Sequence, residues 1–307
     1  MKSAFYLFFI LIIFVGFGCK EKAPISSTDA TGDEYIDYNH KTHSTRTKLF
    51  TPEEELAGFK VPEGFVVELV ASESDGVINP IHIAFDDAGK LWTQTAEMYP
   101  MDPVADIAWH DLLNLMNNPE AQEKDPSFKK IFDLYRGHTK GTDKILVLSD
   151  FYGENKVKSN VWAEGLAIPQ SVLPYKNGSY VAQGSELFFL EDTDEDGKAD
   201  KRTPLFTGFG ITDTHTMAHT LVRAPGDWIH FSHGALNKGK VSSFVSDAEV
   251  RIDYSKIARF SLDAKKLELV NSGLQNIWGY KLRGNGQWYG IEANDLGYSI
   301  VPMEIGT

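Results

Sequence analysis

The sequence has only one cysteine, Cys19, among its 307 residues. This excludes an intramolecular disulfide and a CxxCH haem attachment site. Basic residues are also scarce: 30 Lys and Arg stand against 43 Asp and Glu, and the net charge is −13. Binding to the phosphates of a nucleic acid needs clustered Lys and Arg, which the sequence does not show, so the charge argues against a nucleic-acid partner. The sequence also lacks a Gly-rich phosphate loop, a GxSxG elbow, an HExxH motif and a nicotinamide fingerprint. These absences argue against nucleotide cofactors and serine hydrolysis.

Long apolar runs are missing as well, apart from Phe5 to Val15 near the start of the chain. This run is shorter than the roughly 20 residues that span a bilayer. Lys2 precedes it, and Gly16-Phe17-Gly18 leads into Cys19, as in a bacterial lipoprotein signal. We therefore interpret residues 1–19 as a signal peptide and Cys19 as the lipidated residue. The protein would then be anchored to a membrane of the cell envelope, at the periplasmic or outer-membrane surface. An uncleaved anchor and plain secretion are the alternatives.

The composition changes twice after the signal. Residues 20–55 are mostly polar and predict a disordered tether, because they cannot bury enough apolar surface to fold. Residues 56–307 carry short apolar or alternating runs separated by Gly, Asn and Asp, a pattern typical of all-β proteins. With 42% hydrophobic residues in the whole chain, this domain can bury a substantial core.

A hairpin pattern recurs four times in this domain. Each copy has a strand, a turn containing glycine, and a second strand that opens near an aromatic residue. The copies are IHIAFDDAGKLWTQT from Ile81, QSVLPYKNGSYVAQG from Gln170, HTLVRAPGDWIHFSH from His219 and GYKLRGNGQWYGIEA from Gly279. Their turn glycines are Gly89, Gly178, Gly226 and Gly286.

A further strand follows the hairpins and gives the repeat its length. The segments DKILVLSD and SELFFLED end at Asp150 and Asp192, 42 residues apart. About four strands in such a period are typical of a β-propeller blade, which buries its faces against its neighbours. We therefore predict an all-β fold, a β-propeller of the six-bladed type that is incomplete in this chain. A β-sandwich with similar hairpins is the alternative.

The pattern breaks between about residues 102 and 138. Apolar residues there recur at helical spacing, and Pro119 and Pro126 divide the segment. We expect two short helices inserted beside the first blade, either as a lid over one mouth of the propeller or as a packed surface decoration.

An acidic loop with the spacing of a calcium site follows one of these strands. The sequence DTDEDGKAD from Asp192 places carboxylates at positions 1, 3, 5 and 9 and a glycine at position 6. The predicted ligands are Asp192, Asp194, Asp196, the carbonyl of Lys198, and Asp200. Position 12 is Thr203, so the bidentate Glu of an EF-hand is missing. A solvated acidic turn between two strands is the alternative.

A second polar group precedes the third hairpin, where Asp213, His215 and His219 lie within ITDTHTMAH. Histidine suits proton abstraction near neutral pH, and a carboxylate can fix its tautomer. Residues at strand ends near a propeller axis point into the central channel. Glu97 after the first hairpin, and Asn294 and Asp295 after the fourth, could therefore join them there to bind a cation or a polyol.

Together these segments resemble a known family. The resemblance rests on FKVPEGFVVELVASE, AEMYP, FFLEDTDEDGKADK, LFTGFGITDTHTMAHTL and GLQNIWGYKLRGNGQWYGIEAND, and extends from Leu56 to the end. These segments are similar to the propeller domain of bacterial membrane-bound dehydrogenases. That domain in turn resembles the soluble glucose/sorbosone dehydrogenases that use pyrroloquinoline quinone (PQQ). The resemblance implies PQQ and Ca²⁺ in or over the central channel, and oxidation of a sugar or polyol hydroxyl by base-assisted hydride transfer.

The resemblance also implies roles for individual residues. The general base would be His215, supported by Asp213, because the family often has Asp-Thr-His-His at this position. Gln275 stands where the family has a quinone-contacting Arg, so a charge that would stabilise the reduced quinone is lost. The residues implied or expected near the cofactor are Gln275, Asn276, His219 and Glu97.

Two hypotheses follow. In the first, the chain is a lipid-anchored, quinoprotein-like sugar or polyol dehydrogenase that passes electrons to a separate cytochrome. In the second, it is a non-catalytic propeller of the cell envelope that binds glycan or protein.

Overall fold

The computed structural model describes residues 27–28, 34–35, 50–100, 108–116, 118–151, 157–272, 275–293 and 301–303. The predicted signal peptide and Cys19 lie outside these residues. The chain divides into two compact units, Met1–Glu68 and Leu69–Thr307. Each unit is described by itself.

The first unit contains little regular structure. The two-residue strands β1 (Ser27–Thr28) and β2 (Glu34–Tyr35) pair antiparallel. Helix α1 (Pro52–Gly58) begins at a capping box, in which Thr51 and Glu54 each bond the other's backbone N–H. Beyond α1, the side chains of Phe65 and Val66 are exposed.

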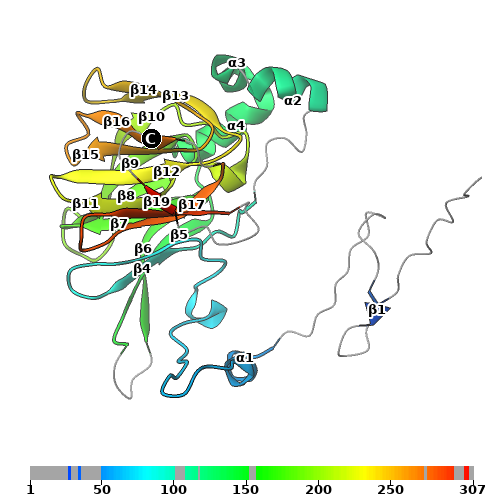
Figure 1. The fold of residues 1–307 in the computed structure, drawn as a ribbon, viewed down its shortest axis with the longest axis vertical. Coiled ribbons are helices and arrows are strands. Elements are labelled where there is room, and N and C mark those ends of the chain that lie inside the picture. Colours follow the sequence, from blue (N-terminus) through cyan, green and yellow to red (C-terminus); the bar gives the residue numbers. More distant parts are fainter. Residues whose placement is uncertain are drawn as a thin grey trace, which may run out of the picture. The chain divides into compact units, whose positions relative to one another are not determined.

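The second unit is built from four antiparallel sheets that follow one another along the chain (Figure 1). The first sheet contains β3 (Ile83–Phe85), β4 (Leu91–Gln94), β5 (Asp143–Ser149) and β6 (Lys158–Leu166). The second contains β7 (Pro169–Tyr175), β8 (Gly178–Gln183), β9 (Glu186–Glu191) and β10 (Lys201–Thr207). The third contains β11 (His219–Ala224), β12 (Trp228–His233), β15 (Lys256–Ser261) and β16 (Leu267–Ser272). The fourth contains β17 (Ile277–Leu282), β18 (Trp288–Glu292) and β19 (Val301–Met303). The 3₁₀ turn η2 (Glu73–Asp75) precedes the first sheet.

The four sheets are arranged as propeller blades. The first strand of each sheet contacts the first strand of the next: β3 contacts β7, β7 contacts β11, and β11 contacts β17. Their inner strands therefore lie around a common space, as blades do around a propeller axis. This confirms the prediction of a β-propeller-like all-β fold, and each predicted hairpin forms the first two strands of one sheet.

Apolar side chains fill the spaces between neighbouring sheets. Trp92, Trp162, Val172 and Phe188 belong to the cluster between the first and second sheets. The largest cluster lies between the second and third sheets, and a smaller one between the third and fourth contains Ile257, Val270, Ile277, Tyr280 and Trp288. Each sheet thus buries its faces against its neighbours, which explains why a short hairpin can be stable here.

One hairpin joins two sheets. The strands β13 (Lys238–Ser243) and β14 (Glu249–Asp253) lie between β12 and β15 in the sequence, within the third sheet's part of the chain. They nevertheless extend the second sheet, because β13 pairs with the end of β10 through Phe206↔Ser243 and Thr207↔Ser242.

The predicted insertion forms three short helices, not two. They are α2 (Trp109–Met116), α3 (Pro119–Lys124) and α4 (Pro126–Tyr135). Asn118 and Asp125 cap α3 and α4, each followed by proline at the first helical position. On α4, Phe128, Phe132 and Tyr135 are buried in a cluster with residues of the second and third blades, including Ile168, Ile211 and Met217.

The carbonyl of Tyr135 anchors α4 to the second sheet. It accepts hydrogen bonds from Gln183 Nε2 and Arg202 Nη2, both at 2.8 Å. Gly184 lies under the Tyr135 ring, with a φ of +54°, and a Cβ there would be 2.2 Å from ring atoms. Only glycine permits both this backbone conformation and this close approach.

We expect Gly184→Ala to destabilise the protein by about 2–4 kcal/mol, because it combines a left-handed alanine with overpacking against a buried ring. Urea unfolding measures the effect, and limited proteolysis should cut more readily within α2–α4. Gly89→Ala is the control, since its φ is +78° and nothing lies within 4 Å of its Cβ position. Equal losses in the two variants would contradict the packing argument.

Candidate functional site

A short 3₁₀ turn, η4 (Thr214–Thr216), carries the predicted histidine and carboxylate. Asp213 caps this turn, and its Oδ1 accepts a hydrogen bond from the backbone N–H of His215 at 3.0 Å. The same oxygen lies 2.9 Å from His215 Nδ1, so the carboxylate holds the ring through that nitrogen. The His215 side chain is 53% exposed, and no hydrogen bond to its Nε2 occurs among the described residues. A histidine oriented in this way can take a proton at Nε2.

Two buried amides fix the turn in place. Asn237, which is fully buried, accepts a hydrogen bond from Asp213 N–H at 3.0 Å and donates to Asp213 O at 2.8 Å. Gln170 at the start of β7 donates from Nε2 to Thr214 O at 3.0 Å. The pair Asp213 and His215 is thus positioned by residues from the second and third blades.

Tyr99 completes the surroundings of His215. The two rings meet edge to face with centroids 5.2 Å apart. Partial burial, and then the charge of Asp213, raise the pKa of the Tyr99 phenol above its ordinary value. Tyr99 therefore stays neutral and can only donate or accept a hydrogen bond near the imidazole.

The insertion reaches this site through Gln122 of α3. Its buried Nε2 donates to Thr212 Oγ1 at 3.1 Å, next to Asp213 in the chain, and to Leu115 O at 2.8 Å. The helices therefore lie beside the site and are packed into the core, so they support the turn that carries His215.

Glu97 lies after β4 with an exposed side chain, while its backbone N–H donates to Asp143 Oδ1 at 2.7 Å. Asp143 is fully buried and also accepts from Thr95 Oγ1 at 3.1 Å and, through Oδ2, from Ile168 N–H at 2.7 Å. One carboxylate thus connects the turn that carries Glu97 with the chain entering β7.

His219 lies at the start of β11 with both ring nitrogens against backbone carbonyls. Nδ1 is 2.6 Å from Met217 O, and Nε2 is 2.7 Å from Ile277 O. Burial lowers the pKa of this imidazole, while the two carbonyls favour the protonated ring. The ring stacks obliquely on Trp278 at 4.5 Å and connects the third sheet to the fourth. Both of its nitrogens are engaged by the main chain, and the residue is one of those that line the cavity described next.

A cavity of about 970 Å³ runs along the first strands of the four sheets. Its lining is mostly apolar and aromatic, with Phe85 and Trp278 among the larger side chains, and it contains no Asp or Glu. Arg223, Lys281 and Arg283 do line it, and none of them forms an ion pair in the described part of the chain. In a protein of net charge −13, this carboxylate-free lining favours an anionic ligand.

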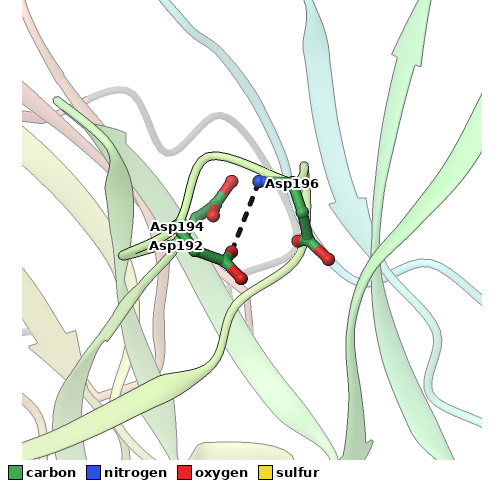
Figure 2. Close-up of side chains that lie close together, drawn as sticks. All are labelled: Asp192, Asp194 and Asp196. Carbon is green, nitrogen blue, oxygen red and sulfur yellow. Dashed lines mark hydrogen bonds between the residues drawn. The ribbon is translucent and has the colours of Figure 1, made fainter.

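Three of the predicted calcium ligands, Asp192, Asp194 and Asp196, lie close together (Figure 2). Carboxylate oxygens of Asp192, Asp194 and Asp196 lie within 4.8 Å of one another, and together they could hold a metal ion. Asp200 instead bonds Thr193, through its N–H at 3.2 Å and its Oγ1 at 2.6 Å. The backbone N–H of Lys198 donates to Asp196 Oδ1 at 2.9 Å.

The remaining predicted residues lie before and after β17 and β18. Gln275 is exposed and Asn276 half-buried; the Gln275 carbonyl accepts a hydrogen bond from Ser255 Oγ, and Asn276 O accepts from Ala293 N–H at 2.8 Å. Asn294 and Asp295 lie outside the described residues. Sequence reasoning did not find Tyr99, Gln170 or Asn237, because single amides and tyrosines carry no motif.

The fold and these sites define an all-β, β-propeller-like protein with a channel cavity, a His–Asp pair and an acidic loop. Residues 51–304 match the family described as a domain of unknown function (DUF7133), and the chain belongs to that family. No curated protein matches the sequence. Among the described residues, no helix is long and apolar enough to cross a membrane.

Several solved structures are similar in chain path. The PQQ domain of pyranose dehydrogenase from Coprinopsis cinerea, in its holo form, is 14% identical, with a TM-score of 0.46 over 80% of this chain and 51% of that one. A carbohydrate-active enzyme of family AA12 from Trichoderma reesei is also 14% identical, with a TM-score of 0.42 over 69% and 45%. A luciferin-regenerating enzyme is 12% identical, with a TM-score of 0.38 over 72% and 58%. The chain thus spans about half the length of these structures.

Proposed function

We propose that this chain is the propeller of a quinoprotein-like dehydrogenase that oxidises a hydroxyl group of a sugar or polyol. The observation that carries the proposal is the His215–Asp213 pair, with Nδ1 held at 2.9 Å and Nε2 directed away from the carboxylate. Removal of a hydroxyl proton is the step that such a pair performs, since the carboxylate stabilises the imidazolium that forms. His215 is the general base and Asp213 its positioning residue.

The residues of the cavity fit the cofactor that the resemblance implies. PQQ is a planar quinone with several carboxylates, and the cavity offers Arg223, Lys281 and Arg283 for the charges and Trp278 for the ring face. When bound, the quinone would accept the hydride from the substrate carbon. Ca²⁺ would accompany it, with Asn294 and Asp295 as the expected ligands. A cytochrome is the proposed electron acceptor, and Cys19 the proposed site of the lipid anchor in the cell envelope.

The test is reconstitution of the purified protein with PQQ and Ca²⁺, followed by absorbance and by reduction of a dye with aldoses and polyols. We expect His215→Ala to lower kcat by about 10²–10⁴-fold, as loss of a general base does. His138→Ala is a matched control, because His138 also contacts an Asp, with Nδ1 3.4 Å from Asp133 Oδ1, on the exposed end of the insertion. An unchanged rate in His215→Ala would remove the assignment of the base.

One observation favours a second candidate function. His215 is not among the residues that line the cavity, so the cavity can hold a ligand without any contact to the base. In that case the chain is a non-catalytic propeller that binds an anionic glycan or another acidic ligand. Absence of any PQQ absorbance change, combined with binding of an acidic oligosaccharide, would select this function over the first.

A further inference from the structure

The acidic loop contains a carboxylate oxygen that the protein itself leaves without a partner. Asp192 is only 9% exposed, and its Oδ1 is buried without a hydrogen bond. Its Oδ2 accepts from Gly197 N–H at 2.9 Å, which fixes the carboxylate inside the loop. A buried anionic oxygen without a donor is costly, so this position is suited to a bound cation.

Two neighbouring carboxylates complete a possible set of metal ligands with Asp192. One carboxylate oxygen from each of Asp192, Asp194 and Asp196 lies within 4.8 Å of the other two, and all three side chains project from one loop (Figure 2). None of the three forms an ion pair in the part of the chain that the structure describes, although Lys198 and Lys201 are close in sequence. Lys201 instead pairs with Glu191 at 2.8 Å. Several hard oxygens without a cationic side chain are the donors that Ca²⁺ prefers.

Backbone hydrogen bonds hold the loop in the shape that the ion requires. Asp194 Oδ1 accepts from Asp196 N–H at 3.4 Å, and Asp196 Oδ1 accepts from Lys198 N–H at 2.9 Å. Gly197 supplies the bend with a φ of +87°. The site therefore needs little rearrangement to bind a metal, which lowers the entropic cost of binding.

The same loop connects two blades. Ala199 N–H donates to Trp162 O of β6, in the first sheet, at 2.7 Å. The Ala199 side chain packs against the cluster of Trp92, Trp162 and Val172 between the first and second sheets. The next residue, Asp200, donates a hydrogen bond from its backbone N–H to Glu191 O of β9 at 2.9 Å. An ion that fixes residues 192–196 thus also fixes the contact between these blades.

The loop lies at the end of the second sheet opposite to His215. Gln170, at the start of β7, contacts the His215 turn. Strands β7, β8 and β9 alternate in direction, so the end of β9, where Asp192 follows, is at the other end of the sheet. A metal bound there is remote from proton transfer at His215.

We propose that Asp192, Asp194 and Asp196 bind one Ca²⁺ ion, and that this ion stabilises the junction between the first and second blades. The proposal does not depend on dehydrogenase activity. It predicts that Ca²⁺ stabilises the protein whether or not a quinone is present.

The experiment measures thermal unfolding and Tb³⁺ luminescence of the whole chain after treatment with a chelator. We expect Ca²⁺ at 100-fold above its Kd to raise Tm by about 5–10 °C. Tb³⁺ should bind in place of Ca²⁺ and be sensitised by Trp162, with Ca²⁺ displacing it. Asp192→Asn should abolish the rise in Tm and the Tb³⁺ signal. Asp194→Asn, at an exposed position, should weaken both, and it provides the test if Asp192→Asn does not fold.

Glu195→Gln is the matched control, because it removes one negative charge from the same loop outside the metal cluster. It should bind Ca²⁺ and respond in Tm as the parent does. Absence of Ca²⁺ and Tb³⁺ binding in the parent would overturn the site. Binding without any rise in Tm would overturn the role at the blade junction.

Discussion

Lowering the pH from 6.5 to 4.5 should destabilise this protein by several kcal/mol. Burial lowers the pKa of His82, His230 and His233 to about 4. The positive charge of Lys281 lowers the pKa of His82 further, and that of Arg259 lowers the pKa of His230. In the unfolded chain each imidazole titrates near its ordinary pKa of about 6.5, so between the two values the unfolded state binds more protons. Stability is therefore fully present above pH 6.5 and is lost as the pH falls toward 4.

Each of these imidazoles contributes at most about 1.4 kcal/mol to the loss of stability for every pH unit between 6.5 and 4. Urea unfolding at half-unit steps from pH 7 to 4.5 measures the slope. His233 is fully buried, and His233→Leu removes its imidazole. The slope of unfolding free energy against pH should then fall by the amount that one proton contributes, about 1.4 kcal/mol per pH unit. His110→Leu is the control, since His110 is exposed on α2. A slope that is the same in both variants would contradict the assignment to buried histidines.

Replacing Asp143 by alanine should lower the free energy of unfolding by about 3–5 kcal/mol, a larger loss of stability than we expect from Gly184→Ala. The buried carboxylate accepts three hydrogen bonds, from Thr95 Oγ1 and from the backbone N–H groups of Glu97 and Ile168. Alanine leaves both N–H groups without this acceptor, and that of Ile168 is buried. The first and second blades lose the hydrogen bonds that join the chain after β4 to the chain before β7.

Asp143→Asn separates charge from hydrogen bonding in this network. The amide keeps one acceptor oxygen, so Asn should recover part of the stability that Ala loses. Asp87→Ala, in the exposed β3–β4 turn, should change the free energy of unfolding by no more than about 0.5 kcal/mol. Chemical denaturation of all three variants provides the comparison. A loss in Asp143→Ala no larger than that in Asp87→Ala would refute the anchoring role.

The repeated hairpins could be predicted from sequence because their signals are local. Turn residues such as Gly89 and Gly226 have φ values of +78° and +80°, which glycine adopts without strain. The third strands were also predictable: β5, β9 and β15 each coincide with a short run rich in apolar residues. The joining of β13 to β10 was not, since it depends on which sheet edge is near in space.

In the candidate site, too, the contacts between residues close in sequence could be predicted, and those between distant residues could not. Asp213 and His215 are two residues apart, so a capped turn brings them together and the sequence alone suggested the pair. Asn237, 24 residues from Asp213, reaches it only because the chain after β12 returns to that turn. In the acidic loop, the carboxylate spacing predicted Asp200 as a ligand; in the structure its carboxylate accepts hydrogen bonds from Thr193 and is not one of the three that cluster.

The pairing of β13 with β10 has a consequence for the edge of the second sheet and for the movement of the blades. An open sheet edge is a template for another chain, and part of the β10 edge is already covered by residues that belong to the third blade's stretch of sequence. The same contact prevents the second and third blades from separating by a simple hinge, because parting them would also break the β10–β13 hydrogen bonds. The two blades thus behave as one mechanical element, protected from strand exchange where β13 covers β10.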